Sequence, residues 1–238
     1  MKPRTPGFWL IVATVGLLAL LPIQALAGMS PEEVKMFTDE MKKAEKGDRV
    51  AQYTLGNCYY NGAGVAKAKA QAVSWYRKAA EQGLAQAQLN LGICYFKGEG
   101  VTKDQVQAAA WWRKAADQGY ADAQSRLGLS YELGYGVAKD QVQAVSWYRK
   151  AAEQGHAKAQ SYLGICYEFG LGVARDQIEA YAFYNLAMAS QTLTEDMIGK
   201  LYFLEKKMSA AQIAAGQKRS IELQKKIAAK IAAKKPVK

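Results

Sequence analysis

The sequence predicts an all-α fold, a right-handed α/α solenoid of about four helix pairs with capping helices at both ends. The first observation behind this prediction is a period of 36 residues. The residues that recur at this period are Gly56, Gly92, Gly128 and Gly164, then Trp75, Trp111, Trp147 and Phe183, then Gly83, Gly119 and Gly155. The second observation is the helical spacing of apolar residues in each copy, and the third is a glycine-containing turn between the two halves. A fixed period of roughly 20 to 50 residues is typical of stacked helical repeats.

Residues 1–27 are expected to lie outside the fold, because they have the anatomy of a secretory signal peptide. Lys2 and Arg4 give a positively charged start, residues 8–21 are almost wholly apolar, and residues 25–27 form an A-x-A cleavage site. The apolar run is short for a membrane span, which needs about 20 residues. The sequence therefore predicts export, with a periplasmic or secreted mature protein. A retained N-terminal membrane anchor is the alternative.

Residues 28–48 are predicted to form an N-terminal capping helix. Ser30 is a suitable N-cap residue, and Pro31 suits the first helical position. Gly47, which ends this segment, lies 36 residues before Gly83. The segment therefore takes the place of the second helix of a repeat. A terminal unit of a solenoid must differ from the others, because its outer face has no neighbour.

Residues 49–192 are predicted to hold the four repeats, each made of two antiparallel helices. In the second copy the first helix covers residues 85–97, with Leu91 and Tyr95 on one face. Gly92 is unusual inside a helix, so we expect the second helix to pack closely against its backbone. A G-x-G-V turn follows, in which glycine allows a positive φ at no steric cost.

The second helix of this copy is expected to begin after Asp104, whose carboxylate can accept hydrogen bonds from the first helical turn. Asp140 and Asp176 repeat this cap, whereas the first copy has Ala68 at the same position. Gly119 is expected to end the helix. The buried stripe is expected to consist of Ala108, Trp111, Trp112, Ala115 and Ala116.

Residues 193–238 are predicted to form C-terminal capping helices with a basic tail. A helix over about residues 194–208 is followed by S-A-A-Q at residues 209–212, which is a capping sequence for a last helix. The chain has a formal net charge of +11, and eight Lys or Arg against the single Glu222 lie in residues 217–238. Because the charge is concentrated in this tail, the sequence predicts no nucleic-acid-binding groove.

The tail has two interpretations. Leu223, Ile227 and Ile231 fall at helical spacing among lysines. One interpretation is that these apolar residues close the end of the solenoid and that the lysines keep it soluble. The other is that the tail is a basic amphipathic helix that makes weak contact with an anionic surface.

Three cysteines in an exported chain raise the question of a disulfide. Cys58, Cys94 and Cys166 occupy the same position of three repeats. Equivalent helices of a stack lie about 8–10 Å apart, whereas a disulfide needs Cα atoms within about 7 Å. All three are therefore interpreted as small apolar core residues.

The motif A-x-A-Q-x-x-L-G-x-x-Y-x-x-G-x-G-V, followed by W-Y-R-K-A-A-E-Q-G, resembles the Sel1-like repeat family. This family is a relative of the tetratricopeptide repeat with a longer loop between its helices, and a spacing of 36 fits it better than the tetratricopeptide value of about 34. The resemblance covers about residues 50–190, and residues 202–217 resemble the C-terminal cap of bacterial members. It implies a solenoid that acts as an adaptor, holding partner proteins in assembly, signalling or cell-envelope complexes.

A second function follows from the same resemblance. A secreted, cysteine-rich branch of the family has been credited with binding or hydrolysing β-lactams. Its members carry a disulfide-forming cysteine pair in every repeat, whereas this chain has at most one cysteine per repeat. A β-lactam-binding or β-lactam-hydrolysing protein is therefore the alternative to an adaptor.

The first helices supply the candidate partner-binding positions, because in related solenoids they line the inner face. The positions beside the core stripe are called the groove set below. The groove set is Tyr53, Asn57, Tyr60, Leu89, Ile93, Phe96, Ser125, Leu129, Glu132, Ser161, Ile165 and Glu168. Exposed apolar patches usually mark contact sites, so the set predicts protein binding. The alternative is that Leu89, Ile93 and Ile165 pack against the adjacent helix.

No catalytic residue, cofactor site or metal site is predicted. His156 is the single histidine, and it has no second histidine or cysteine at a suitable spacing for a metal or a nucleophile pair. The G-x-G turns lack the preceding strand and the third glycine of a dinucleotide site. The sequence therefore predicts a non-catalytic protein.

Overall fold

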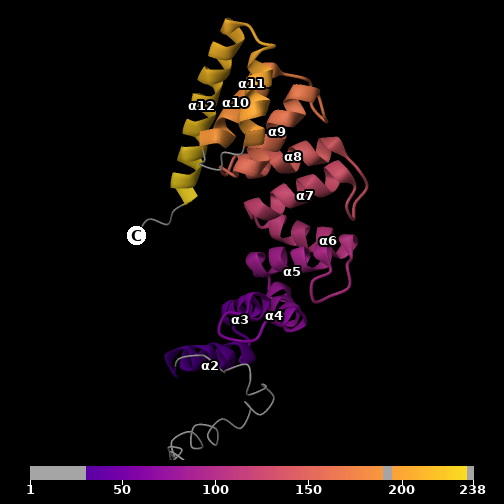
Figure 1. Cartoon of the computed structure of the whole chain (residues 1–238), viewed down its shortest axis with the longest axis vertical. Coiled ribbons are helices and arrows are strands. Elements are labelled where there is room, and N and C mark those ends of the chain that lie inside the picture. The colour runs from indigo at the N-terminus through magenta and orange to yellow at the C-terminus, as the bar shows by residue number, and fades with distance from the viewer. Residues whose placement is uncertain (1–30, 190–194, 235–238) are drawn as a thin grey trace, which may run out of the picture. The chain divides into compact units, whose positions relative to one another are not determined.

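The computed structural model describes residues 31–189 and 195–234, and within these ranges it contains eleven helices and no strand (Figure 1). The helices are α2 (Pro31–Glu45), α3 (Arg49–Asn61), α4 (Lys69–Glu81), α5 (Ala85–Lys97), α6 (Gln105–Asp117), α7 (Ala121–Leu133), α8 (Gln141–Ala152), α9 (Ala157–Phe169), α10 (Gln177–Ala189), α11 (Glu195–Glu205) and α12 (Ala210–Lys234). None of these helices is long and apolar enough to cross a membrane. The expected signal peptide, residues 1–27, lies outside the described residues.

The chain divides into two compact units, one up to Ala79 and one from Ala80 onward. In the first unit α2 packs against α3. The rings of Phe37 and Tyr59 meet edge to face, with centroids 6.1 Å apart. This is the contact expected of a capping helix, because α2 covers a face of α3 that would otherwise expose its apolar side chains.

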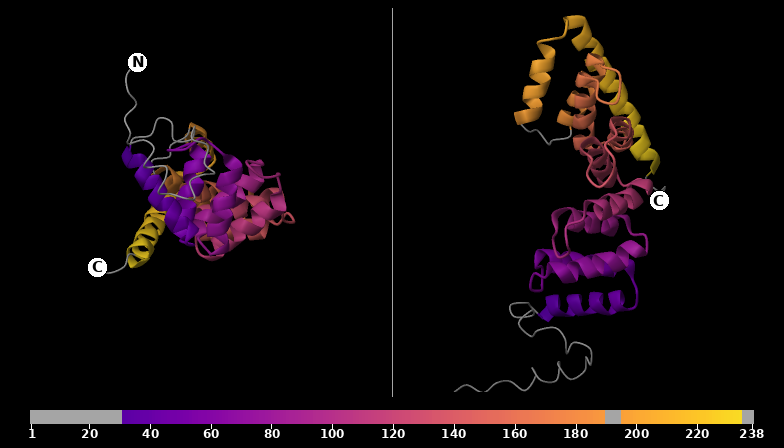
Figure 2. Two further views of the ribbon diagram at one scale, coloured as in Figure 1. Left: turned by 90° about the horizontal axis from the view of Figure 1, so that it is seen from below. Right: turned by 90° about the vertical axis from the view of Figure 1, so that its right-hand side faces the viewer.

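In the second unit, consecutive helices pack in sequence from α5 to α10, and α11 and α12 both pack against α10. Figure 1 and Figure 2 show α12 lying alongside α10. The pairing of neighbouring helices confirms the predicted α/α solenoid.

The recurring helix glycines lie directly under an aromatic ring of the second helix of the same repeat. The predicted close packing of the second helix against the glycine backbone is therefore confirmed, and the structure adds that a ring makes the contact. A Cβ atom on Gly92 would lie 2.5 Å from the Trp112 ring, and one on Gly128 would lie 2.6 Å from the Tyr148 ring. Real Cβ atoms do not approach other atoms so closely. Glycine is therefore needed here for close approach, and its lower helix propensity is offset by the packing of a large buried ring.

The predicted aspartate caps are present. The carboxylate of Asp104 accepts a hydrogen bond from the Gln107 amide at 2.9 Å, and Asp140 accepts one from the Gln143 amide at 3.0 Å. Asp176 accepts from two amides at the start of α10. The side chains of these caps satisfy N–H groups that have no partner within the helix.

The two tryptophans of α6 differ, which corrects the expectation that both belong to the buried stripe. Trp112 is buried, whereas Trp111 is half-buried. The Lys114 ammonium lies 4.0 Å from the centroid of the Trp111 ring, a cation–π contact at the surface. Because adjacent helical residues point about 100° apart, only one member of the pair can face the repeat glycine.

All three cysteines are free thiols. Cys94 and Cys166 are buried, and Cys58 is half-buried. Burial raises the pKa of the Cys166 thiol to about 12. The thiols therefore have the environment of small apolar core residues, as the sequence predicts.

Candidate functional site

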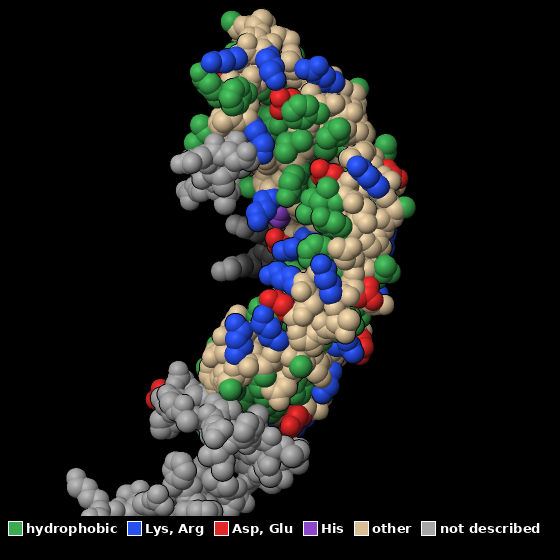
Figure 3. All heavy atoms as spheres, turned by 45° about the vertical axis from the view of Figure 1, so that its right-hand side comes forward, with side chains coloured by type: hydrophobic (Ala, Val, Ile, Leu, Met, Phe, Trp, Pro, Cys, Tyr) green, Lys and Arg blue, Asp and Glu red, His purple; other side chains and the backbone are tan. Residues whose placement is uncertain are grey.

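The groove set lies on α3, α5, α7 and α9, and the structure divides it by burial. Leu89, Ser125 and Glu168 are buried, so their side chains are not presented to a partner. The other nine members are half-buried: Tyr53, Asn57, Tyr60, Ile93, Phe96, Leu129, Glu132, Ser161 and Ile165. Figure 3 shows that hydrophobic side chains gather in several patches on the face it displays, with Lys and Arg between them.

In the first unit the three members of the groove set surround one buried ring. The rings of Tyr53 and Tyr60 lie 6.0 Å and 6.3 Å from that of Tyr76, measured between centroids. The Tyr76 hydroxyl donates to the Asn57 carbonyl oxygen at 2.8 Å. Asn57 is thereby assigned a structural role, because a buried phenol needs a hydrogen-bond acceptor.

In the second repeat Leu89 belongs to a core cluster around Trp112, with Ile93 and Phe96 packed at its edge. The Trp112 indole N–H donates to the Leu89 carbonyl at 3.3 Å. Phe96 lies against two rings, at 5.4 Å from Trp112 and 5.5 Å from Tyr135 between centroids. Ile93 and Phe96 therefore each have one side in the core and one side toward solvent.

The two acids of the groove set are acceptors for core tyrosines. The Tyr148 hydroxyl donates to Glu132 at 2.5 Å, and the Tyr184 hydroxyl donates to Glu168 at 2.9 Å. Burial and then the bond to Glu132 raise the pKa of Tyr148 above its ordinary value. The acids therefore stabilise the same contact between helix glycine and aromatic ring that Asn57 serves in the first repeat.

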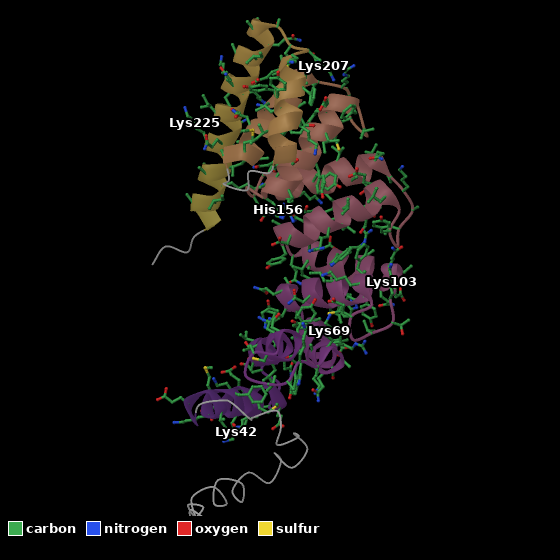
Figure 4. All side chains as sticks on the ribbon, in the orientation of Figure 1. Lys42, Lys69, Lys103, His156, Lys207 and Lys225 are labelled. Atoms are coloured by element: carbon green, nitrogen blue, oxygen red, sulfur yellow. The ribbon has the colours of Figure 1, made fainter. Side chains whose placement is uncertain are left out.

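Helix α11 covers the groove set at the fourth repeat. Ile165 packs in a cluster with Leu201 and Met208, and the Lys207 ammonium lies 3.8 Å from the buried Glu168 carboxylate. Lys207, labelled in Figure 4, lies in the turn between α11 and α12. The first-helix face is thus covered by the C-terminal cap at α9. The half-buried apolar members of the groove set on α5 and α7 are Ile93, Phe96 and Leu129. These three residues are called the α5–α7 patch below.

The large apolar side chains that are most exposed lie outside the groove set, and the sequence prediction missed them. Among the described residues they include Val106, Leu133, Val142, Phe169, Ile198, Tyr202 and Phe203. Tyr202 and Phe203 lie on α11, where their rings meet edge to face. A helical wheel of α11 could have shown that at least one of these two rings is exposed, because adjacent residues of a helix cannot both face the same neighbouring helix.

A row of buried glutamines joins the repeats, and this too was missed. The Gln88 side-chain amide donates to the Ala80 carbonyl at 3.0 Å, and the Gln124 amide donates to the Ala116 carbonyl at 3.1 Å. Gln118 donates in turn to the Gln88 side-chain oxygen at 2.8 Å. The recurrence of A-x-A-Q in the sequence could have indicated this row. The glutamine recurs because the carbonyls in the last turn of the preceding helix have no donor within that helix, and the side-chain amide supplies one.

His156 is the N-cap of α9. Its Nδ1 accepts a hydrogen bond from the Ala159 amide at 3.1 Å, and its Nε2 lies 3.3 Å from a carboxylate oxygen of Asp122. Leu84 and Tyr120, its counterparts, provide no side-chain cap. Across the residues that the structure describes, no group of three or more His, Cys, Asp or Glu could hold a metal ion. The arrangement around His156 is that of a helix cap.

Comparison with known proteins gives one family. The model of the Sel1 repeat matches residues 49–84, 85–120, 121–156 and 157–189. A protective antigen present in uropathogenic Escherichia coli strains, which displays an SLR fold, is 39% identical with a TM-score of 0.75, over 86% of this chain and 44% of the antigen. A Sel1 repeat protein from Oxalobacter formigenes is 31% identical with a TM-score of 0.67, over 82% of this chain and 76% of that protein. This chain thus spans less than half the length of the antigen. No curated protein matches it.

Proposed function

Because the chain belongs to the Sel1 repeat family, we propose that it is a non-catalytic adaptor that binds a partner protein on the face of its first helices. Sel1 repeat proteins are in general protein-interaction scaffolds. The observation that supports this face is the α5–α7 patch, in which Ile93, Phe96 and Leu129 are half-buried apolar side chains on neighbouring repeats. A partner can bury the apolar surface of such side chains with little loss of side-chain conformational entropy, because packing against the core already restricts each of them.

The proposed place of action is the cell envelope. The signal-peptide anatomy of residues 1–27 supports export to the periplasm or beyond the cell. Retention through an uncleaved N-terminal anchor is the alternative. Mass determination of the N-terminus of the protein isolated from cells distinguishes the two. A chain that begins at Gly28 supports cleavage of the signal peptide, and a chain that begins at Met1 supports the retained anchor.

Partner binding is tested by affinity capture from an envelope extract. Leu129 is the preferred site for a variant, because it is half-buried and its side chain is in none of the core clusters around α7. Leu129→Asp should reduce the recovery of a bound partner about tenfold or more, while the protein keeps its helical circular dichroism spectrum. A charge placed in an apolar interface costs more than one decade of affinity.

The chain offers a matched control. Val142 is an apolar residue on α8, in the second-helix layer, and the residue is 65% exposed. Val142→Asp should leave partner recovery unchanged. If Val142→Asp abolishes capture and Leu129→Asp does not, the binding face is the second-helix layer and the proposal is wrong.

The alternative function, binding or hydrolysis of a β-lactam, is tested separately. A chromogenic cephalosporin mixed with micromolar protein should show no turnover and no stoichiometric labelling. Hydrolysis that copurifies with the folded protein would overturn the proposal of a non-catalytic adaptor.

A further inference from the structure

A cavity of about 420 Å³ lies where α12 passes over α8, α9 and α10 in the second unit. Its lining is Arg149, Ala152, Glu153, Tyr167, Glu179, Phe183, Arg219, Leu223, Lys226, Ile227 and Lys230. This volume is within the usual range of sites for small molecules, which is about 300–1,000 Å³. The cavity is separate from the α5–α7 patch, so it does not depend on the proposed adaptor function.

The inner wall of the cavity is formed by two aromatic rings. The rings of Tyr167 and Phe183 are stacked, with centroids 5.8 Å apart and planes 5° apart. Opposite them, Leu223 and Ile227 of α12 are half-buried against the same core cluster. The cavity therefore has walls that would favour an alkyl or aromatic body.

The side chains that line the cavity carry more positive than negative charge, with four Lys or Arg against two Glu. Lys230 pairs with Glu153 at 2.7 Å, and Arg219 pairs with Glu179 at 2.7 Å. These two pairs use both acids of the lining, and two cations remain. Arg149 donates to the Tyr167 hydroxyl at 3.0 Å, and within residues 31–189 and 195–234 neither Arg149 nor Lys226 is ion-paired.

We propose that this cavity binds a small amphipathic anion, with an alkyl or aromatic body against Tyr167 and Phe183 and a carboxylate or phosphate head held by Arg149 and Lys226. An anion there would offset positive charge on Arg149 and Lys226, the two lining cations that are not paired with an acid of the lining. A guanidinium and an ammonium on one rim suit such a head group, because both donate charge-assisted hydrogen bonds. The aromatic wall of the cavity disfavours inorganic phosphate, because phosphate has no apolar part that could cover the rings of Tyr167 and Phe183.

The test uses the mature protein with decanoate and decyl phosphate, each below its micelle-forming concentration, in calorimetric titrations. At least one of the two should bind, whereas decylamine should not. The double variant Arg149→Ala, Lys226→Gln should weaken binding about tenfold or more, because two charge-assisted contacts are lost. The tighter of the two probes identifies the head group.

Two matched controls exclude a general effect of lost charge. Arg113 occupies the position of Arg149 one repeat earlier and does not line the cavity. Lys225 is the neighbour of Lys226, and it lies exposed on α12 (Figure 4). The double variant Arg113→Ala, Lys225→Gln should bind both probes like the unaltered protein. No binding of either anion, equal binding of decylamine, or equal weakening in the control variant would each overturn the proposal.

Discussion

At the scale of single residues, one contact is repeated in every copy: an aromatic ring of the second helix lies on a glycine of the first. The rings belong to Tyr76, Trp112, Tyr148 and Tyr184. Each ring is deeply buried, and each has a polar atom that would be costly to leave without a partner. The acceptors differ from repeat to repeat, being a side-chain amide, a backbone carbonyl or a carboxylate. The aromatic ring therefore recurs with the 36-residue period, whereas the type of hydrogen-bond acceptor differs between repeats.

Tyr148→Phe tests this contact through pH. Burial and the bond to Glu132 raise the pKa of Tyr148 above the ordinary value of 10.0, so the folded state favours the neutral phenol. The stabilisation is complete below pH 10 and is lost as the pH rises above it, by up to about 1.4 kcal/mol per pH unit. Thermal unfolding of the Phe variant should show a shallower loss of stability above pH 10. At pH 8 the variant should be about 1–3 kcal/mol less stable, because Glu132 loses its donor. Identical alkaline slopes in the two proteins would contradict the assignment.

A second prediction concerns the rates at which the three cysteine thiols react. With an aromatic disulfide reagent at pH 8, Cys58 should react first, since it is half-buried, whereas Cys94 and Cys166 are buried. Burial also raises the pKa of the Cys166 thiol to about 12, so almost no thiolate is present at pH 8. In denaturant all three should react at one rate. Rapid reaction of Cys166 in the native protein, followed by mass spectrometry, would show that the fourth repeat opens readily.

At the scale of the helix, several elements begin with a side-chain cap, and the first helices α3, α5, α7 and α9 each end at a glycine of positive φ. The sequence indicated the aspartate caps of α6, α8 and α10, because Asp three residues before Gln or Glu is a local signal. The capping box at Ser209 was equally visible, and the structure shows both of its bonds with Gln212. His156 was not predicted as a cap, because an imidazole acceptor is not a common N-cap residue.

Two glycine-to-alanine changes separate packing from helix propensity. Gly128→Ala would place a Cβ atom 2.6 Å from the Tyr148 ring and should destabilise the protein by about 3 kcal/mol, as overpacking does. Gly199→Ala, in α11, meets no heavy atom within 4 Å and should stabilise by about 0.5–1 kcal/mol, since alanine is the better helix former. Urea unfolding measures both. Equal effects of the two changes would mean that the glycines recur for backbone reasons alone.

The candidate site was less predictable than the helices, and the reason is contact between elements. The sequence placed Leu89 and Glu168 on the first-helix face. It could not show that the Trp112 indole N–H would donate to the Leu89 carbonyl, or that the Tyr184 hydroxyl of α10 would donate to Glu168. It also could not show that α11 would turn back over Ile165. A periodic pattern tells which residues share a face. It does not tell which neighbour covers that face.

At the scale of the second unit, α12 closes the end of the stack. Leu223 and Ile227 pack against the cluster of the last repeats, Arg219 pairs with Glu179, and Lys230 pairs with Glu153. These contacts are those of the first interpretation of the tail, in which its apolar residues cap the solenoid. Ile231 is 42% exposed, so the distal turn of α12 keeps free surface. Weak contact of that turn with an anionic surface stays a prediction.

Removal of α12 tests how the stack is stabilised. A chain that ends at Met208 loses the ring contact of Tyr181 with Gly216, the hydrogen bond between Asn185 and Ser220 at 3.0 Å and the ion pair of Glu179. In a linear array each repeat is stabilised mainly by its neighbours, so the loss should be local. Hydrogen exchange followed by mass spectrometry should show faster exchange in α9 and α10, with α5 to α7 close to the intact protein. A chain that ends at Lys234 keeps the whole of α12 and is the control. If removal of α12 instead speeds exchange equally from α5 to α10, the second unit folds as one cooperative block and the array description is wrong.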